Sequence, residues 1–213
     1  MTPGRPDESL DLPEGFAPGN TYDKYRTKNP LYRRLMDRFL SDAGALVGLA
    51  DPGRVLEVGC GPGDLARRLF SSEQDYIGVD ISQEEVSRAR SAHPDLDFRA
   101  ASIYELPFAD RSFDLVVACE VLEHLAEPRR GLDELNRVCS GHLLASVPWE
   151  PAWRLLNLAR GAYLRQFGNT PGHLQHFSRR RFRRLVRQRF ELVTERRPFP
   201  WTMLLARASA LEK

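Results

Sequence analysis

The fold is decided by one stretch of the sequence, VLEVGCGPGDL at residues 55–65. It opens as an apolar run with β-branched residues, which is typical of a strand buried on both faces of a sheet. Three glycines follow at alternate positions, and apolar residues then return at helical spacing. A strand, a glycine turn and a helix in this order predict a doubly wound α/β fold, in which a ligand meets bare backbone at a helix N-terminus.

The spacing of the glycines indicates the kind of ligand. A dinucleotide-binding turn reads G-x-G-x-x-G, but Asp64 stands where that pattern has its third glycine. The loop has no basic residue to meet a phosphate, and Glu57 at the strand end would repel one. An acidic residue beside a glycine turn favours a ligand with a cationic, amino-bearing end. S-adenosylmethionine (SAM) has such an end and no phosphate.

The segment EVGCGPG at residues 57–63 resembles the first motif of the Rossmann-like SAM-dependent methyltransferases of the ubiquinone and menaquinone type, methyltransferase type 11. The resemblance implies an α/β fold with a mostly parallel seven-stranded sheet, an antiparallel last strand and helices on both faces. It also implies SAM as cofactor and S-adenosylhomocysteine as product. It covers roughly residues 30–208 and is most specific at residues 55–64 and at Asp80.

A second acidic residue supports SAM as the ligand. Asp80 ends the apolar run at 76–79 and lies 19 residues beyond Gly61, the distance at which an acidic residue reaches ribose hydroxyls in nucleotide-binding βαβ units. The alternative is a cap for the helix that begins near Ser82. The resemblance places the cofactor on Glu57, Gly59, Gly61, Asp80, Ile81, Ser102, Ile103 and Glu120. Ser102 stands where the family commonly has Asp, and a hydroxyl binds the adenine amino group more weakly than a carboxylate does.

The segment EVLEHL at residues 120–125 carries most of the remaining chemistry. It follows the buried apolar run at 112–119, whose carboxyl end should face the ligand. It resembles the fourth motif of the family, where quinone-precursor O-methyltransferases and small-RNA 2′-O-methyltransferases bind a divalent cation with an E-x-x-E-H set. Glu120, Glu123 and His124 match that set. His124 is therefore a metal ligand, a base without metal, or a helix cap.

Two further histidines lie in the segment GHLQHFS at residues 172–178. The small-RNA methyltransferases supply another metal-ligating histidine from a comparable segment, so His173 or His176 could complete a site. A His followed by an aromatic residue and Ser is also common in the general family, where Ser178 would cap the next helix. We take His124, His173 and His176 as the catalytic candidates and leave the metal site unassigned.

The remaining pattern completes the sheet and sets the domain boundaries. We expect a flexible leader at residues 1–20, which hold four prolines and three glycines, and one domain at 21–213. Within it, residues 149–177 are expected to be an insertion that covers the substrate. Gly141 is expected to turn the chain into the fifth strand. The expected helices span 31–47, the segment after Pro128 and 178–190, and the expected strands span 55–58, 76–79, 96–99, 112–119, 143–147, 190–194 and 201–206.

Charge and cysteine content bound the location and the partners. No apolar run of about 18 residues predicts a membrane span, and three cysteines without pairing or zinc spacing indicate a reducing, cytoplasmic setting. The net charge is +2, yet residues 151–213 carry 14 basic and 3 acidic residues. Such a surface could attract nucleic acid, anionic lipid or a phosphorylated substrate, or it reflects an arginine-rich genome. The helix at 178–190 holds seven arginines but no stacking platform, so it is a weak signal for RNA.

These observations favour an enzyme that methylates an oxygen atom of a small-molecule metabolite. Oxygen is favoured because no motif for amino-group methylation is present. The alternatives are a metal-assisted RNA 2′-O-methyltransferase and a non-catalytic SAM-binding protein. Nucleic acid is thus the less favoured partner, and a divalent metal stays an open possibility.

Overall fold

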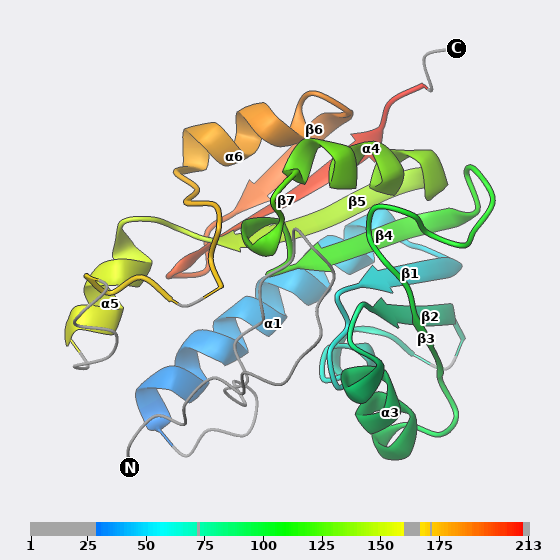
Figure 1. Ribbon diagram of the computed structural model, residues 1–213, viewed down its shortest axis with the longest axis horizontal. Helices are drawn as coiled ribbons and strands as arrows, with labels where there is room; N and C mark the ends of the chain where they lie inside the picture. The colour runs from blue at the N-terminus through cyan, green and yellow to red at the C-terminus, as the bar shows by residue number, and fades with distance from the viewer. Residues whose placement is uncertain (1–28, 72, 160–166, 171, 211–213) are drawn as a thin grey trace.

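The computed structural model describes residues 29–71, 73–159, 167–170 and 172–210 of the chain. The expected leader at residues 1–20 lies outside these residues and stays a prediction. A seven-stranded sheet runs through the centre, with the strand order β3-β2-β1-β4-β5-β7-β6 (Figure 1). The strands are β1 (Arg54–Val58), β2 (Asp75–Asp80), β3 (Asp97–Ala100), β4 (Phe113–Cys119), β5 (Cys139–Pro148), β6 (Phe190–Arg196) and β7 (Trp201–Ala208).

The strand directions confirm the predicted fold class. Strands β1 to β5 pair in parallel, and β7 lies antiparallel between β5 and β6. From β1 the chain runs outward to β3 and then crosses back to β4 on the other side of β1. The carboxyl ends of β1 and β4 therefore flank the switch point of the sheet, where doubly wound folds bind their ligands.

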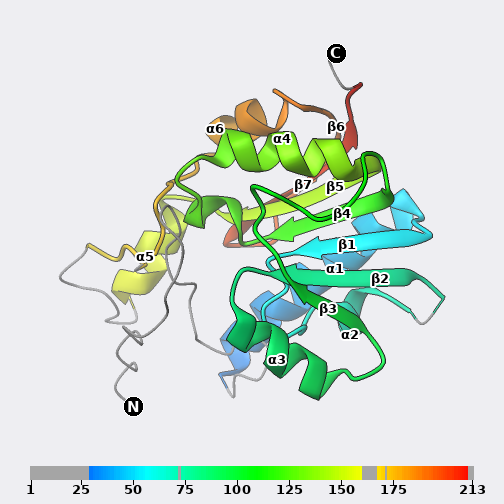
Figure 2. The ribbon, with the colours of Figure 1, turned by 45° about the vertical axis from the view of Figure 1, so that its right-hand side comes forward.

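Helices cover both faces of the sheet, and each face has its own apolar cluster (Figure 2). Apolar side chains of α1 and α3 belong to one cluster, and those of α4 and α6 belong to the other. The helices are α1 (Pro30–Ala50), α2 (Ala66–Leu69), α3 (Gln83–Ala92), the 3-10 turn η1 (Leu122–His124), α4 (Pro128–Val138), α5 (Ala152–Ala159) and α6 (Arg179–Val186). No helix in the described part of the chain is both long and apolar enough to cross a membrane.

The first helix begins where the sequence predicts. Asn29 caps α1, because its side-chain oxygen accepts the backbone N–H of Leu31 at 3.0 Å, and Pro30 occupies the first helical position. The helix extends to Ala50, three residues beyond the predicted end. Its buried side chains belong to the same apolar cluster as side chains of β1, β5 and β7, and the helix packs on that face of the sheet.

The turn predicted at Gly141 is wrong. Helix α4 ends at Val138 and β5 begins at the next residue, so that Gly141 lies inside the strand. It lies beside an irregularity in β4, where the register shifts between Phe113 and Leu115. A Cβ on Gly141 would lie 2.3 Å from the backbone oxygen of Asp114. Glycine is needed here for the close approach of two strands.

Candidate functional site

The glycine turn after β1 has the backbone geometry that its sequence requires. Gly59, Gly61 and Gly63 all have positive φ, at 74°, 52° and 83°, a region that side chains with a Cβ rarely adopt. A Cβ on Gly59 would lie 2.5 Å from Val121 Cγ2, whereas a Cβ on Gly61 would meet no atom within 4 Å. Gly59 therefore serves the packing of the turn against η1. Gly61 presents bare backbone that a ligand can approach.

Asp80 connects the glycine turn to the next helix. One carboxylate oxygen accepts the backbone N–H of Gly61 at 2.9 Å, and the other accepts that of Ser82 at 2.9 Å. Burial raises the pKa of Asp80, and the N–H groups of Ser82, Gly61 and Ile81 oppose that shift. Ser82 caps α3 through its hydroxyl, which accepts the N–H of Glu85. Asp80 is therefore not the N-cap, and its proposed role toward ribose stays a prediction.

Glu57 is buried at the end of β1, where its carboxylate accepts the hydroxyl of Tyr76 at 2.6 Å. Burial raises its pKa to about 8, the Tyr76 hydrogen bond lowers it, and repulsion from Asp80 and Asp64 raises it further. The carboxyl group is thus largely protonated at neutral pH. A cationic group bound nearby would favour the ionised form. Sequence reasoning missed Tyr76, because only the register of β1 against β2 brings it to Glu57.

We expect Glu57→Gln to flatten the pH dependence of stability. The folded protein binds the Glu57 proton more tightly than the unfolded chain, whose pKa is near the ordinary 4.5. The stabilisation is present below about pH 4.5 and is lost as the pH rises toward 8, on the order of a few kcal/mol in total. The glutamine is always neutral and removes this slope. Urea unfolding of both proteins between these two pH values measures the difference.

Glu84→Gln is the control for that experiment, since Glu84 is exposed on α3 and pairs with Arg88. The free energy of unfolding of the Glu84→Gln variant should depend on pH in the same way as that of the unchanged protein. Equal slopes for the Glu57→Gln variant and the unchanged protein would contradict the assigned pKa.

The expected adenine-side residues lie in a tight turn after β3. The Ser102 hydroxyl accepts the backbone N–H of Tyr104 at 3.2 Å, and its backbone oxygen accepts that of Glu105 at 3.0 Å. Ile103 is buried and packs against α4, where a Cβ on Gly131 would lie 3.5 Å from Ile103 Cδ1. The contact of Ser102 and Ile103 with adenine stays a prediction.

A group of ionisable side chains gathers just beyond the carboxyl end of β4. Glu123 and His124 lie on η1, and one ligand atom each from Glu123, His124 and His173 lie within 4.8 Å of one another. The rings of His124 and His173 meet edge to face with their centroids 5.0 Å apart. His124 Nδ1 lies 2.9 Å from the carbonyl oxygen of Gly172. A carbonyl only accepts, so Nδ1 carries a hydrogen, and in the neutral ring Nε2 has the lone pair.

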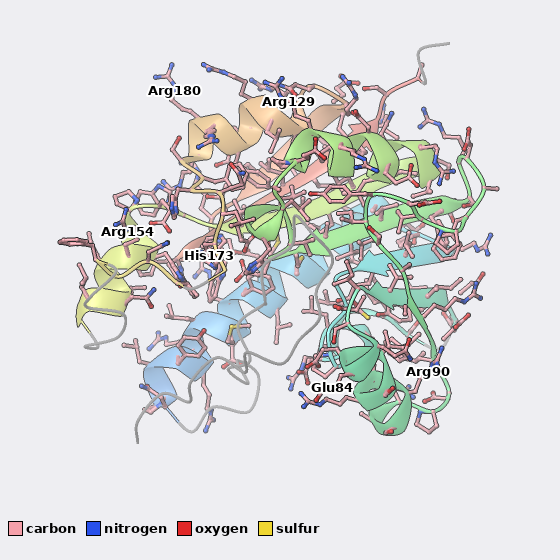
Figure 3. The ribbon with its side chains drawn as sticks, viewed as in Figure 1. Glu84, Arg90, Arg129, Arg154, His173 and Arg180 are labelled. Atoms are coloured by element: carbon pink, nitrogen blue, oxygen red, sulfur yellow. The ribbon has the colours of Figure 1, made fainter. Side chains whose placement is uncertain are left out.

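The loop that carries His173 is fastened to η1 and α5. The backbone oxygen of Glu123 accepts the N–H groups of Leu174 and Gln175, both at 2.9 Å. The ring of His173 stacks on Trp153 of α5 with centroids 6.4 Å apart, and Trp153 Nε1 donates to the hydroxyl of Thr170 at 2.8 Å. Figure 3 shows His173 at this end of the sheet, beside α5.

Two predicted residues lie outside this group. His176 Nδ1 lies 3.9 Å from a carboxylate oxygen of Glu150, and partial burial together with the charges of Arg154 and Arg181 lowers the pKa of His176. Glu120 directly follows β4, has φ of 63°, and donates its N–H to the Ser146 oxygen at 3.0 Å. The structure therefore brings together Glu123, His124 and His173. In this group His173 stands in place of Glu120 of the predicted E-x-x-E-H set.

Comparisons with known proteins bear on the family of the chain. A family described as a methyltransferase domain matches residues 56–142. The chain is 34% identical over 155 residues to a probable S-adenosylmethionine-dependent methyltransferase of Mycolicibacterium smegmatis, covering 68% of this chain and 56% of that protein. It is 32% identical over 147 residues to a demethylmenaquinone methyltransferase of Beutenbergia cavernae, covering 68% of this chain and 61% of that protein. The chain thus spans little more than half the length of these two curated relatives.

A solved structure shows the same fold. The magnesium protoporphyrin IX methyltransferase of Synechocystis with bound SAH is 20% identical, with a TM-score of 0.64. The alignment covers 86% of this chain and 89% of that protein. At this level of identity the likeness concerns the fold alone.

Proposed function

Because the chain contains a methyltransferase domain of the SAM-dependent family over residues 56–142, we propose that it transfers a methyl group from SAM to an oxygen atom of a small-molecule metabolite. The observation that carries the proposal is the state of His124. Its Nδ1 contacts the Gly172 carbonyl, so in the neutral ring Nδ1 donates and Nε2 is the proton-accepting nitrogen, just beyond the carboxyl end of β4. A hydroxyl group is the acceptor that needs such a base.

The residues present fit SAM. Gly61 offers bare backbone, Asp80 offers a carboxylate beside it, and Glu57 can ionise when a cation binds nearby. We assign the cofactor to Glu57, Gly59, Gly61, Asp80, Ile81, Ser102, Ile103 and Glu120. When bound, SAM would supply a methyl carbon activated by its sulfonium. We place the reaction in the cytoplasm, and the three free, buried cysteines support a reducing compartment.

The chain's own residues align the reactants and move one proton. The ring of His124 would accept the hydroxyl proton at Nε2 while the acceptor oxygen takes the methyl carbon, whose bond to the sulfur of SAM breaks to leave S-adenosylhomocysteine. His173 packs edge-on against the His124 ring and holds it in place. Most of the rate gain then comes from positioning the two reactants, and the histidine contributes a further part through proton transfer.

The test is methyl labelling in an extract of the host. The protein is incubated with methyl-labelled SAM, and small molecules, lipids, proteins and nucleic acids are then separated. We expect label among the small molecules or lipids. Label confined to RNA would overturn the small-molecule acceptor, and SAM binding without label in any pool would favour a non-catalytic SAM-binding protein.

The Glu123, His124 and His173 group also favours a second candidate, a metal-assisted methyltransferase. One carboxylate and two imidazoles within 4.8 Å of one another suit a divalent transition metal or Zn²⁺. Such an ion would lower the pKa of the acceptor hydroxyl. An RNA 2′-hydroxyl is the acceptor that this candidate would take.

A chelator separates the two candidates. Labelling that survives exhaustive chelation supports His124 as the base. Labelling that is lost on chelation, and restored by Mn²⁺ or Zn²⁺, supports the metal. His173→Ala should then weaken Co²⁺ binding, followed by the visible absorption of the histidine-bound ion.

A further inference from the structure

Three large apolar side chains stand exposed on and beside α5. Leu155 is 63% exposed, Leu158 37% and Phe167 75%. Leu155 and Leu158 lie one turn apart on the same face of the helix. Phe167 is brought beside them, because a Cβ on the next residue, Gly168, would lie 3.0 Å from Leu158 Cγ. We call these three residues the α5 apolar face.

The opposite side of α5 is firmly attached to the protein. Trp153 packs on Trp201 of β7 with ring centroids 5.8 Å apart. Asn157 Nδ2 donates to the backbone oxygen of Gly168 at 2.8 Å, and Arg154 Nε donates to that of Phe167 at 3.2 Å. The buried polar and aromatic side chains therefore fix the helix. The α5 apolar face is held outward in a defined position.

The surroundings of this face are strongly basic. The described residues between 149 and 190 include eight arginines and one acidic residue, Glu150. Arg179 lies over the ring of Trp149, directly before α5, at 3.8 Å from its centroid. No ion pair within 4 Å among the described residues involves Arg154, Arg179 or Arg180. Figure 3 shows Arg180 extending outward from the start of α6.

We propose that the α5 apolar face and the arginines beside it dock the protein on an anionic lipid membrane. Apolar side chains that enter the boundary between headgroups and acyl chains, flanked by cations that meet lipid phosphates, are what holds an amphipathic helix on a bilayer. A membrane fits this surface better than RNA. Two of its three residues are leucines, which offer no ring for a base to stack on, whereas single-strand binders stack successive bases on several aromatic side chains.

The proposed surface lies close to the candidate site. Helix α5 follows the carboxyl end of β5, and Trp153 on its inner side stacks on His173. Docking would therefore hold the His124 and His173 end of the sheet at the membrane. This inference goes beyond the proposed reaction and does not depend on it.

Flotation of the full chain with lipid vesicles tests the proposal. The protein should float with vesicles of phosphatidylglycerol and phosphatidylcholine in equal parts, and not with phosphatidylcholine alone. The double variant Leu155→Ser/Phe167→Ser should bind the anionic vesicles at least about tenfold more weakly, since it loses the two most exposed side chains of the α5 apolar face. The matched control Leu49→Ser/Val193→Ser changes two exposed apolar residues on α1 and β6 and should bind as before.

A second variant tests the charge. Arg180→Gln should weaken binding and reduce its sensitivity to salt. Thermal unfolding verifies that all variants fold, and SAM binding is measured separately, so that a failure of the proposed function is distinguishable. The proposal is overturned if the unchanged protein does not float, or if the two double variants bind equally. Tight binding of a single-stranded RNA in the same buffer, with no flotation, would show that the basic surface serves nucleic acid.

Discussion

Replacing Gly61 by alanine is expected to weaken SAM binding by about 100-fold, which corresponds to about 2.7 kcal/mol of binding free energy. A methyl group at this position would meet no atom of the described residues within 4 Å. It would occupy the side of the turn against which we propose that SAM binds. The fold itself should lose only about 1 kcal/mol, because φ of 52° lies in the left-handed region that alanine adopts with modest strain. Isothermal titration with SAM and thermal unfolding measure the two effects.

The neighbouring glycine should behave differently. A Cβ on Gly59 would lie 2.5 Å from Val121 Cγ2, so Gly59→Ala should lower the melting temperature as well as SAM binding. Gly48→Ala on α1 is the neutral control, because its Cβ meets no atom within 4 Å and alanine favours a helix. If Gly61→Ala bound SAM with unchanged affinity, the cofactor would not lie against this turn, and the assignment of Gly61 and Asp80 would fail.

The sequence predicts the backbone of the glycine turn well, because that turn depends on local features. The alternation of glycines fixes positive φ values at Gly59, Gly61 and Gly63, and the distance from Gly61 to Asp80 follows from one βαβ unit. The same reasoning places Ser178 as the cap of α6, which the structure confirms. Each of these features requires only neighbours along the chain or in adjacent strands.

The histidine group and the partner of Glu57 depend on contacts between distant parts of the chain, which no local pattern specifies. The choice of His173 over His176 follows from the docking of residues 174 and 175 on the Glu123 carbonyl, about fifty residues earlier in the chain. The Glu57 to Tyr76 hydrogen bond depends on the burial of both side chains as well as on register. The expected turn at Gly141 fails for a related reason. Glycine is required there because the backbone of β4 approaches closely, and not because the chain turns.

Replacing His124 by alanine is expected to reduce methyl transfer by a factor of about 10²–10⁴, the range typical of a lost general base. Binding of SAM should change little, because His124 is not among the residues assigned to the cofactor. The reaction loses the proton acceptor at Nε2, which the Nδ1 bond to Gly172 holds in the required tautomer. Transfer of labelled methyl into the acceptor pool of the host extract measures the loss.

Two other histidines make this test specific. His142→Ala should transfer methyl groups as before, since His142 lies near the amino end of β5, whereas the site lies at the carboxyl ends of the parallel strands. His173→Ala should also lose activity. The His173 ring packs edge to face against the His124 ring, and its removal leaves the His124 ring without that support. Full activity of His124→Ala would remove both candidates that use it, as base and as metal ligand, because each requires the same nitrogen.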